Sequence, residues 1–136
     1  MIQQTLVVPT PGRGLVDITA QVLGVVSGSG VQTGLCHVFL QHTSASLVIQ
    51  ENADPDVLHD LNAWFERAVT DGDPSYLHDA EGPDDMSGHI RAALTASALT
   101  IPIVDGRLGL GTWQGVYLFE HRTFPHRRSL VITVHS

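Results

Sequence analysis

The chain has 136 residues and a mass of 14.7 kDa, so one domain spanning residues 1–136 can bury a hydrophobic core without disulfides. Its formal net charge is −7, with seven arginines and no lysine, which argues against a nucleic-acid-binding protein because such proteins carry a basic patch. No long apolar run and no basic segment followed by an apolar one are present, so we expect a cytoplasmic protein that does not enter a membrane.

The first fifty residues are predicted to form strands around one short helix. Residues 2–8 read as a strand that ends at a Pro- and Gly-rich turn, and residues 15–18 are too short to assign. Thr19 can cap a brief helix that ends at a run of serines and glycines. Residues 34–41 and 46–50 predict two core strands.

Two helices are predicted between the central strands. Asp54 is suited to a helix cap and Pro55 to the first helical position, so an amphipathic helix begins there. Its helical period predicts a buried face made of Val57, Leu58, Leu61, Trp64, Phe65 and Ala68. A second helix over residues 86–97 is capped by Asp84 and Asp85. Its predicted inner face consists of Met86, Ile90, Ala93 and Leu94.

The segment between these helices, residues 71–83, is polar, rich in Gly and Pro, and without periodicity. Loops of this length inside a small domain are usually functional. The segment carries Tyr76, His78 and Asp79, which are therefore candidates for a site.

The last third of the chain contains only strands and turns. Asp105-Gly106 is a hairpin turn between two short strands, and residues 116–122 and 128–135 predict two longer ones. The predicted fold class is α+β, a single domain with seven or eight mostly antiparallel strands and two main helices.

Four groups of polar residues are not explained by the predicted core. They are His42 with Thr43, Ser44 and Ser46; Glu51 with Asn52 and Asp54; His78 through His89; and Glu120 with Arg122. His42 continues the strand face that carries Val38 and Leu40, so its imidazole is held where a core strand meets solvent. Glu120 follows an apolar run in the same way.

Each group also has a structural interpretation. Asp54 is more simply a helix cap, the hydroxyls can bond turn backbone, and His89 can be a satisfied imidazole at a helix edge. Five further histidines have no positional argument and are interpreted as surface or structural: His37, His59, His121, His126 and His135.

Two chemistries fit these residue types. Imidazoles with a carboxylate bind divalent metals, zinc most commonly, although no His-x-x-x-His or Cys-x-x-Cys spacing is present and distant segments would have to assemble the site. An imidazole beside a carboxylate is also a general acid/base pair, with arginines and hydroxyls holding an anion such as phosphate. No dinucleotide fingerprint, P-loop or Gly-x-Ser-x-Gly elbow is present.

Three sequence blocks carry a family pattern. They are His-Thr-Ser-Ala-Ser-Leu from residue 42 with Gln-Glu-Asn-Ala-Asp-Pro from residue 50, Gly-Pro-Asp-Asp-Met-Ser-Gly-His from residue 82, and Leu-Gly-Thr-Trp-Gln-Gly-Val-Tyr-Leu-Phe-Glu from residue 110. Together, in this order and spacing, they closely resemble the YjbQ-like family, also described as the secondary thiamine-phosphate synthase enzyme family. Ser87 stands where the family usually has proline, at a helix start that permits proline without requiring it.

The resemblance implies a strongly curved antiparallel sheet and a homotrimer whose pockets lie near subunit boundaries. It also implies that the family's motif positions are His42, Glu51, Asn52, Asp54, His78, His89, Thr112, Trp113, Gln114 and Glu120. The implied activity joins a pyrimidine diphosphate to a thiazole phosphate and releases pyrophosphate, a reaction that ordinarily needs a divalent cation.

Our leading hypothesis is a small cytoplasmic enzyme that acts on a phosphorylated small molecule. The predicted catalytic residues are His42, Glu51, His89 and Glu120; the predicted substrate-binding residues are Thr43, Ser44, Asn52, Thr112, Trp113, Gln114 and Arg122; and the predicted ligands of a zinc or magnesium ion are His42, His78 and His89. Two alternatives use the same pocket: a metal-assisted hydrolase of phosphate or other esters, and a non-catalytic trimer that binds a small anion.

Overall fold

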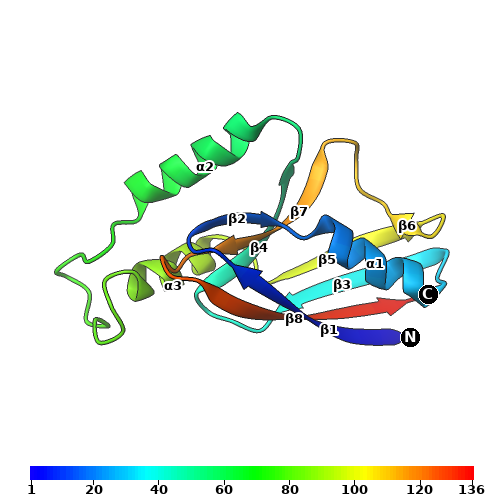
Figure 1. Cartoon of the computed structure of the whole chain (residues 1–136), viewed down its shortest axis with the longest axis horizontal. Coiled ribbons are helices and arrows are strands. Elements are labelled where there is room, and N and C mark those ends of the chain that lie inside the picture. Colours follow the sequence, from blue (N-terminus) through cyan, green and yellow to red (C-terminus); the bar gives the residue numbers. More distant parts are fainter.

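Two antiparallel β-sheets pack against each other, and two of the three helices lie over the outer side of the smaller sheet (Figure 1). The computed structural model describes residues 1–136. Its elements are, in chain order, β1 (Ile2–Thr10), β2 (Gly14–Asp17), α1 (Thr19–Ser29), β3 (Thr33–Leu40), β4 (Ala45–Glu51), α2 (Pro55–Ala68), α3 (Asp85–Leu94), β5 (Ala98–Val104), β6 (Arg107–Leu108), β7 (Gln114–Glu120) and β8 (His126–His135). The predicted α+β class with antiparallel strands is confirmed.

The strand order determines which chain segments meet at the ends of the sheets. The larger sheet has the order β1-β8-β3-β5-β6, and the smaller sheet has the order β2-β7-β4. Every neighbouring pair is antiparallel. The segment between β3 and β4 crosses from the larger sheet to the smaller one, so residues 41–44 lie at an end of the sandwich.

Strand alternation places one face of each sheet in a shared core. In β3, Cys36, Val38 and Leu40 are buried while the residues between them point outward. Val116 and Leu118 of β7 enter the same core from the smaller sheet. Helix α1 contributes Val22, Val25 and Val26. Removal of these apolar side chains from water is the main stabilising term.

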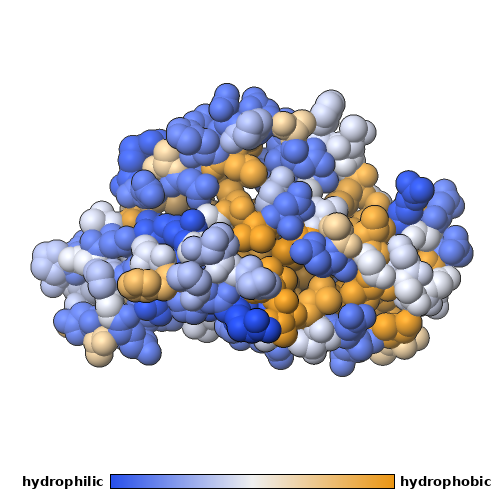
Figure 2. Space-filling model, in the orientation of Figure 1, coloured by the Kyte–Doolittle hydropathy of each residue, from blue (hydrophilic) through white to orange (hydrophobic).

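Helix α2 begins as predicted but buries less of its apolar face. Asp54 accepts a hydrogen bond from a backbone N–H in the first turn (2.9 Å), and Pro55 is the first helical residue. Only Phe65 is buried, with its ring edge-on to Phe119 of β7 and 5.2 Å between ring centroids. Trp64 is 49% exposed, and apolar surface is visible between α2 and the sheets (Figure 2). The prediction of a fully buried face was wrong because only the stretch around Phe65 reaches the sheet.

Helix α3 directs a polar face to the interior, contrary to the prediction. The predicted inner face is partly or fully exposed, and Leu94 at its end is 58% exposed. The buried residues are instead Asp85, Ser87, Gly88 and Arg91. The cause is the layer beneath the helix, where Ser46 of β4 and His121 after β7 are themselves buried and polar.

Helix α1 begins at Thr19, and Ile18 occupies the capping position. The predicted Thr19 cap was wrong because Thr19 is the first helical residue, and the side chain that bonds to this helix start is Asp17. Its carboxylate accepts hydrogen bonds from the Thr19 backbone N–H (2.9 Å) and hydroxyl (2.6 Å). The helix ends at Gly30, whose left-handed φ of 73° suits glycine.

The longest helix, α2, has 14 residues. None of the three helices combines the length and apolar character that spanning a lipid bilayer requires.

Two glycines are predicted to respond in opposite directions to alanine. Gly34 of β3 lies against the backbone of β8, where a Cβ would overlap the carbonyl oxygen of His135. Gly24 lies on α1, where nothing comes within 4 Å of the position that a Cβ would take. We expect Gly34→Ala to lower the free energy of unfolding by roughly 1–3 kcal/mol. Gly24→Ala should raise it by roughly 0.5–1 kcal/mol. Urea denaturation measures both, and equal effects would contradict the close β3–β8 approach.

Candidate functional site

Arg122, in the turn after β7, ties that turn to the start of α3. Its Nε donates to Asp84 (3.1 Å), its Nη1 to Asp85 Oδ1 (2.8 Å) and its Nη2 to the Glu81 carbonyl oxygen (2.9 Å). Burial alone raises the pKa of Asp84, but hydrogen bonds from the Thr123 backbone and from Arg122 outweigh burial and lower it to about 2. Arg122 was predicted to bind substrate, but its guanidinium is hydrogen-bonded to Asp84, Asp85 and the Glu81 backbone at the start of α3.

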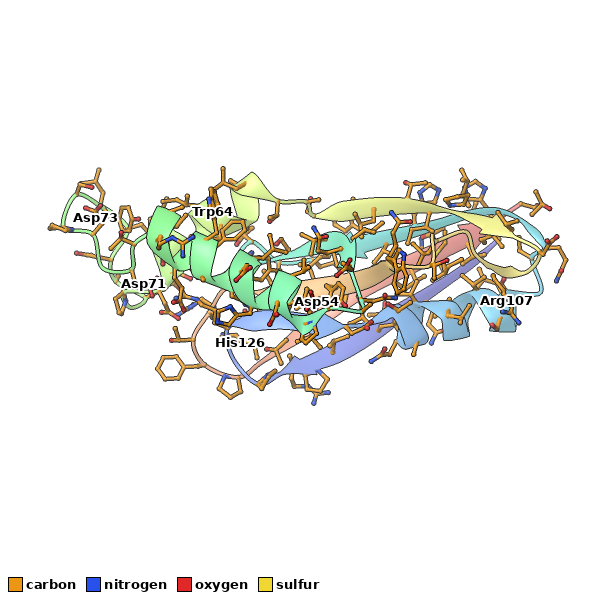
Figure 3. All side chains as sticks on the ribbon, turned by 90° about the horizontal axis from the view of Figure 1, so that it is seen from above. Asp54, Trp64, Asp71, Asp73, Arg107 and His126 are labelled. Atoms are coloured by element: carbon orange, nitrogen blue, oxygen red, sulfur yellow. The ribbon has the colours of Figure 1, made fainter.

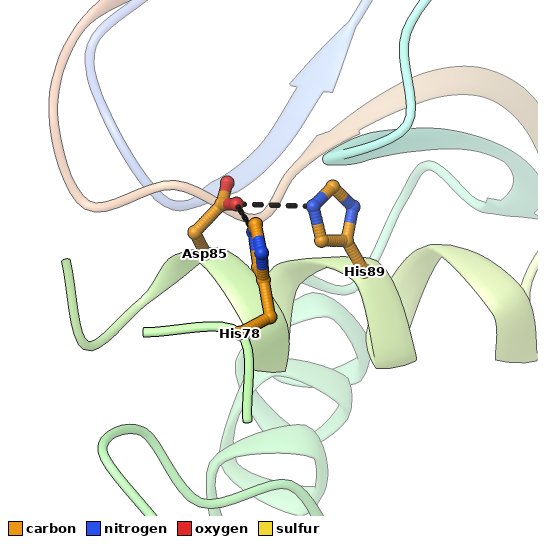
Figure 4. A group of neighbouring side chains, drawn as sticks. All are labelled: His78, Asp85 and His89. Atoms are coloured by element: carbon orange, nitrogen blue, oxygen red, sulfur yellow. Dashed lines mark hydrogen bonds and ion pairs between the residues drawn. The ribbon is translucent and has the colours of Figure 1, made fainter. Parts of the chain in front are cut away.

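Asp85 lies between two imidazoles (Figure 4). Its Oδ2 is 2.6 Å from Nε2 of His78 and 3.0 Å from Nε2 of His89. Asp85 and His89 are four residues apart on α3 and share a helix face, whereas His78 comes from the loop before the helix. One ligand atom from each side chain lies within 4.8 Å of the other two. These three residues are called the His–Asp–His group below.

The hydrogen bonds of His89 determine which of its nitrogens can bind a ligand. Nδ1 donates to the Thr43 carbonyl oxygen (2.8 Å), so Nε2 carries the free lone pair when the ring is neutral. That lone pair faces the Asp85 carboxylate, and two acceptors repel each other unless a proton or a cation lies between them. The hydrogen bond to Asp85 raises the pKa of His78. The His–Asp–His group therefore requires shared positive charge.

Asp85 supplies the negative charge of the group. Burial raises its pKa, but the hydrogen bond with His78 and the charges of His89 and Arg122 together lower it by more. The Asp85 side chain is 4% exposed, whereas those of His78 and His89 are 43% and 30% exposed. A small ion can thus reach the two imidazoles from solvent, while the carboxylate lies on the buried side of the group.

The donor set fits zinc better than magnesium. Two imidazole nitrogens and a carboxylate oxygen suit zinc, and three protein ligands are the usual number in catalytic zinc sites, whereas magnesium prefers oxygen ligands. Ligated histidines usually donate their other ring N–H to an oxygen, as His89 does to Thr43. Arg122 orients Asp85 in the same supporting manner. Of the two ions that the sequence left open, zinc and magnesium, the donor set of His78, Asp85 and His89 therefore suits zinc.

A shallow pocket of about 290 Å³ adjoins the group. His42, from the segment between β3 and β4, and His89, from α3, both line it. The other lining residues are Thr43, Ala45, Ala92, Ala93 and Ser97. The two histidines that were predicted to be catalytic therefore lie around one hollow, which the fold assembles from distant segments.

His42 lies in the pocket wall and outside the His–Asp–His group, although it was predicted as a metal ligand. Its Nε2 accepts a hydrogen bond from the Ser129 backbone N–H (2.8 Å), and its Nδ1 lies 3.3 Å from Nη1 of Arg128, a group that can only donate. Burial and the nearby Arg128 lower the pKa of His42, which keeps the ring neutral at pH 7. The lone pair that a metal would need is thus already in use.

Glu120 joins the two sheets at the end of the sandwich. It is fully buried, and Arg128 of β8 donates to both of its oxygens, with 2.8 Å between Nε and Oε1. The Thr10 hydroxyl and the Arg122 backbone N–H donate to it as well. Burial raises the pKa of Glu120, but the hydrogen bonds from Arg128 and Thr10 lower it by more. Glu120 was predicted to be catalytic, but no oxygen is left free for that role.

Two of the predicted hydroxyls have structural partners. Ser44 is buried and accepts a hydrogen bond from Arg128 Nη2 (3.0 Å). Ser46 Oγ is 2.8 Å from Nε2 of His121, a fully buried ring whose pKa burial lowers to about 3. Thr43 differs, because it is exposed and borders the pocket.

The remaining predicted residues gather at the opposite end of the smaller sheet. In β4, Ala45 pairs with Glu120 of β7 at one end, and Glu51 pairs with Gln114 at the other. A strand of seven residues is roughly 20 Å long, so the two ends do not meet within one chain. Asp54, which belongs to this second set, lies well away from Asp71 in the loop (Figure 3). The second set comprises Glu51, Asn52, Asp54, Thr112, Trp113 and Gln114.

Backbone hydrogen bonds hold this second set together. The Asn52 backbone N–H donates to the Trp113 carbonyl oxygen (2.9 Å). The Gln114 side chain accepts from the Gly111 backbone N–H (2.8 Å). Thr112 and Trp113 are exposed, and Trp113 exposes 62% of its surface. The sequence predicted one site, but within a single chain these residues form two separate polar regions.

The sequence interpretation missed the importance of Asp85, because an aspartate at a helix start is most often a cap. One usable signal was its spacing of four residues from His89, which places both on one helix face. Ser87, the departure from the family pattern, is buried and donates a hydrogen bond to Asp71.

The fold and the site are those of a small α+β protein in which two packed antiparallel sheets carry a His–Asp–His group at one end. A family model described as UPF0047 protein YjbQ-like matches residues 4–136. The chain belongs to this YjbQ-like family, as its three sequence blocks predict.

Individual relatives resemble the chain over almost its whole length. A UPF0047 protein from Synechocystis is 55% identical over 97% of this chain and 90% of its own length. The UPF0047 protein YjbQ from Escherichia coli O157:H7 is 41% identical, with coverages of 97% and 96%. The crystal structure of a conserved hypothetical protein from Thermus thermophilus matches with a TM-score of 0.87 and 36% identity, covering 97% of this chain and 99% of that one.

Removal of Glu120 is predicted to destabilise the fold. Glu120→Ala leaves the Arg128 charge buried without its partner, so we expect a loss of roughly 3–5 kcal/mol in the free energy of unfolding. Glu51→Ala, at the partly exposed end of β4, is the matched control and should change it by roughly 0.5 kcal/mol or less. Urea denaturation of both variants measures the difference. An unchanged midpoint for Glu120→Ala would show that this carboxylate does not hold the sheets together.

The contact between His78 and Asp85 is predicted to depend on pH. Because the folded-state pKa of His78 is raised above 6.5, the contact stabilises the fold fully below that value and loses its effect as pH rises through the raised pKa. In metal-free protein, we expect NMR titration of the His78 ring to give a pKa above 6.5. Asp85→Asn should return it toward 6.5, whereas Asp79→Asn in the same loop should not. If the His78 pKa is unchanged in the Asp85→Asn variant, the contact is ruled out.

Proposed function

We propose that this protein is a zinc-dependent enzyme that acts on a phosphorylated small molecule. The observation that carries the proposal is the convergence of His78 and His89 on one carboxylate oxygen of Asp85. A purely structural aspartate would be satisfied by its contact with Arg122 and by the helix start. Two solvent-accessible imidazoles on the same oxygen favour a bound cation.

The residues have distinct roles in this proposal. His78, Asp85 and His89 hold the ion, which when bound polarises a phosphate oxygen and stabilises the negative charge that develops there. Arg122 keeps Asp85 in position by binding its other oxygen. His42 lies in the wall of the adjoining pocket as a neutral imidazole that borders the space for a bound substrate.

The charges around the site favour binding of a phosphate by the metal ion rather than by an arginine. Arg13, Arg122 and Arg128 are each already paired with a carboxylate of the chain. The chain as a whole carries a net charge of −7, which repels an anion unless a local positive charge compensates. A divalent ion in the His–Asp–His group would supply that charge.

The family resemblance suggests a specific reaction, the joining of a pyrimidine diphosphate to a thiazole phosphate with release of pyrophosphate. A divalent cation stabilises such a leaving group. Metal-assisted hydrolysis of a phosphate ester is the second candidate, and the exposure of His78 and His89 supports it because water can reach the site. Non-catalytic binding of a small anion would use the same group without turnover.

We also propose that the protein forms a homotrimer with pockets near subunit boundaries. The outward-facing side chains of β3 include Leu35 and Phe39, which are 37% and 50% exposed. Trp64 and Trp113 are also large exposed apolar side chains. An assembly that covers such surfaces would explain why they are apolar. It could also bring the Glu51 end of one chain close to the pocket of another.

Metal analysis and activity assays on matched variants test the enzyme proposal. We expect the protein to retain one zinc ion per chain after dialysis, and His89→Ala and Asp85→Asn to lose it. His59→Ala, which removes an exposed histidine outside the site, should keep it. Formation of thiamine phosphate, or hydrolysis of p-nitrophenyl phosphate for the second candidate, should fall by roughly 10²–10⁴-fold in the first two variants. Equal zinc content and equal rates in all proteins would refute the proposal.

A further inference from the structure

The loop of residues 71–83, which supplies His78 to the His–Asp–His group, is exposed at its tip and closed at its base. Residues 77–81 are all exposed, so burial does not hold the tip in place. At the base, the Gly72 backbone N–H donates to the Pro83 carbonyl oxygen (2.9 Å), which brings the two ends of the loop together. The position of His78 next to Asp85 therefore depends on how the base of the loop is fixed.

Asp71, the first residue of this loop, is held by Arg13 from the turn between β1 and β2. Nη1 of Arg13 donates to Asp71 Oδ2 (2.7 Å) and Nη2 donates to Oδ1 (2.9 Å), the two-bond geometry that makes arginine–carboxylate pairs strong and directional. The two side chains are 14% and 34% exposed, so the contact is partly shielded from water. Burial raises the pKa of Asp71, but the hydrogen bonds from Arg13 and Ser87 lower it by more, and the carboxylate stays charged at pH 7.

The same arginine attaches the loop to the segment that also fixes Asp85. Nε of Arg13 donates to the His121 carbonyl oxygen (2.9 Å), and the next residue, Arg122, holds Asp85 through its Nη1 (2.8 Å). The His121 ring is fully buried and bonded to Ser46 of β4, which makes this point of the chain rigid. The start of the loop and Asp85 are thus attached to adjacent residues after β7.

We propose that Arg13 and Asp71 are positioning residues of the candidate metal site. They attach the loop to the same segment as Asp85, so that His78 lies at the carboxylate before an ion binds. Such preorganisation strengthens binding, because the loop does not have to be ordered when the ion arrives. The inference rests on the proposed zinc site, in which His78 is the one ligand that comes from outside α3.

Ser87 gives this chain a second attachment of Asp71. Its hydroxyl donates to Asp71 Oδ1 from the first turn of α3, the helix that carries the other two ligands. Proline, the usual family residue at this position, has no hydroxyl and would leave the attachment to Arg13 alone. Because a neutral donor contributes less than a charged one, loss of the Ser87 bond should weaken metal binding less than loss of Arg13 does.

A double-mutant cycle with His78 tests the positioning role. Zinc affinity is measured on the full chain by competition with a chromophoric chelator. We expect Arg13→Ala to weaken it by roughly tenfold, the lower end of the effect of groups that orient metal ligands. In the His78→Ala background, the same substitution should change it by less than about twofold, because the loop no longer carries a ligand. Arg107→Ala, which removes an exposed arginine of β6, should change neither affinity.

Equal weakening in both backgrounds would overturn the proposal, because it would indicate a general loss of stability rather than a misplaced His78. Zinc affinity that Arg13→Ala leaves unchanged would overturn it as well. If Arg13→Ala does not fold, Arg13→Lys takes its place in the cycle, because lysine keeps the charge but cannot form the planar fork.

Hydrogen exchange of the metal-free chain separates this proposal from the zinc-enzyme proposal. The Gly72 amide, whose bond to Pro83 closes the base of the loop, should exchange faster by roughly tenfold or more in Arg13→Ala, since hydrogen bonds to charged groups contribute about that factor. Asp71→Asn should act in the same direction, and Arg107→Ala should have no effect. A parent chain that binds no zinc would refute the enzyme proposal alone, whereas an unchanged Gly72 exchange rate would refute the positioning role.

Discussion

Arg122 positions the carboxylate on which the candidate metal site depends, because its Nη1 holds one oxygen of Asp85 and leaves the other directed at His78 and His89. Further bonds to Asp84 and to the backbone make this arrangement rigid, as the planar fork of a guanidinium allows and a lysine ammonium does not. Since Arg122 follows β7, the central strand of the smaller sheet, the register of that sheet sets the geometry of the site.

Charged residues at this end of the sandwich form two layers with different roles. Between the sheets, Glu120 and Arg128 are buried and fully hydrogen-bonded, so they join the sheets and exclude solvent. Outside the smaller sheet, Asp85 is buried while His78 and His89 remain accessible. Both carboxylates are buried, and the exposure of their partners distinguishes the one that holds the fold from the one that can serve chemistry. Residue type alone does not make this distinction, which is why Glu120 looked catalytic in the sequence.

Strands and helix starts could be predicted because they depend on neighbours along the chain. The cap at Asp54 and the strands β3 and β4 lie close to where alternation and capping residues predict them. The inner face of α3 could not be predicted, since Arg91 is buried over polar residues of other strands that a helical pattern does not reveal. Asp85 was missed for the same reason, because His78 and Arg122 give it its role across the fold. His42 and His89, the two histidines predicted as catalytic, do share a pocket. The alternation along β3 correctly predicted the side to which His42 points.

The pairing of β1 with β8 has a consequence for biosynthesis. β1 is an edge strand of nine residues whose only partner is β8, so it can form no ladder until β8 has also been synthesised. The bond from Thr10 to Glu120 has to wait as well. During translation, β1 is therefore an unpaired edge that is open to pairing with other nascent chains. The larger sheet closes only once residues 126–135 have cleared the exit tunnel.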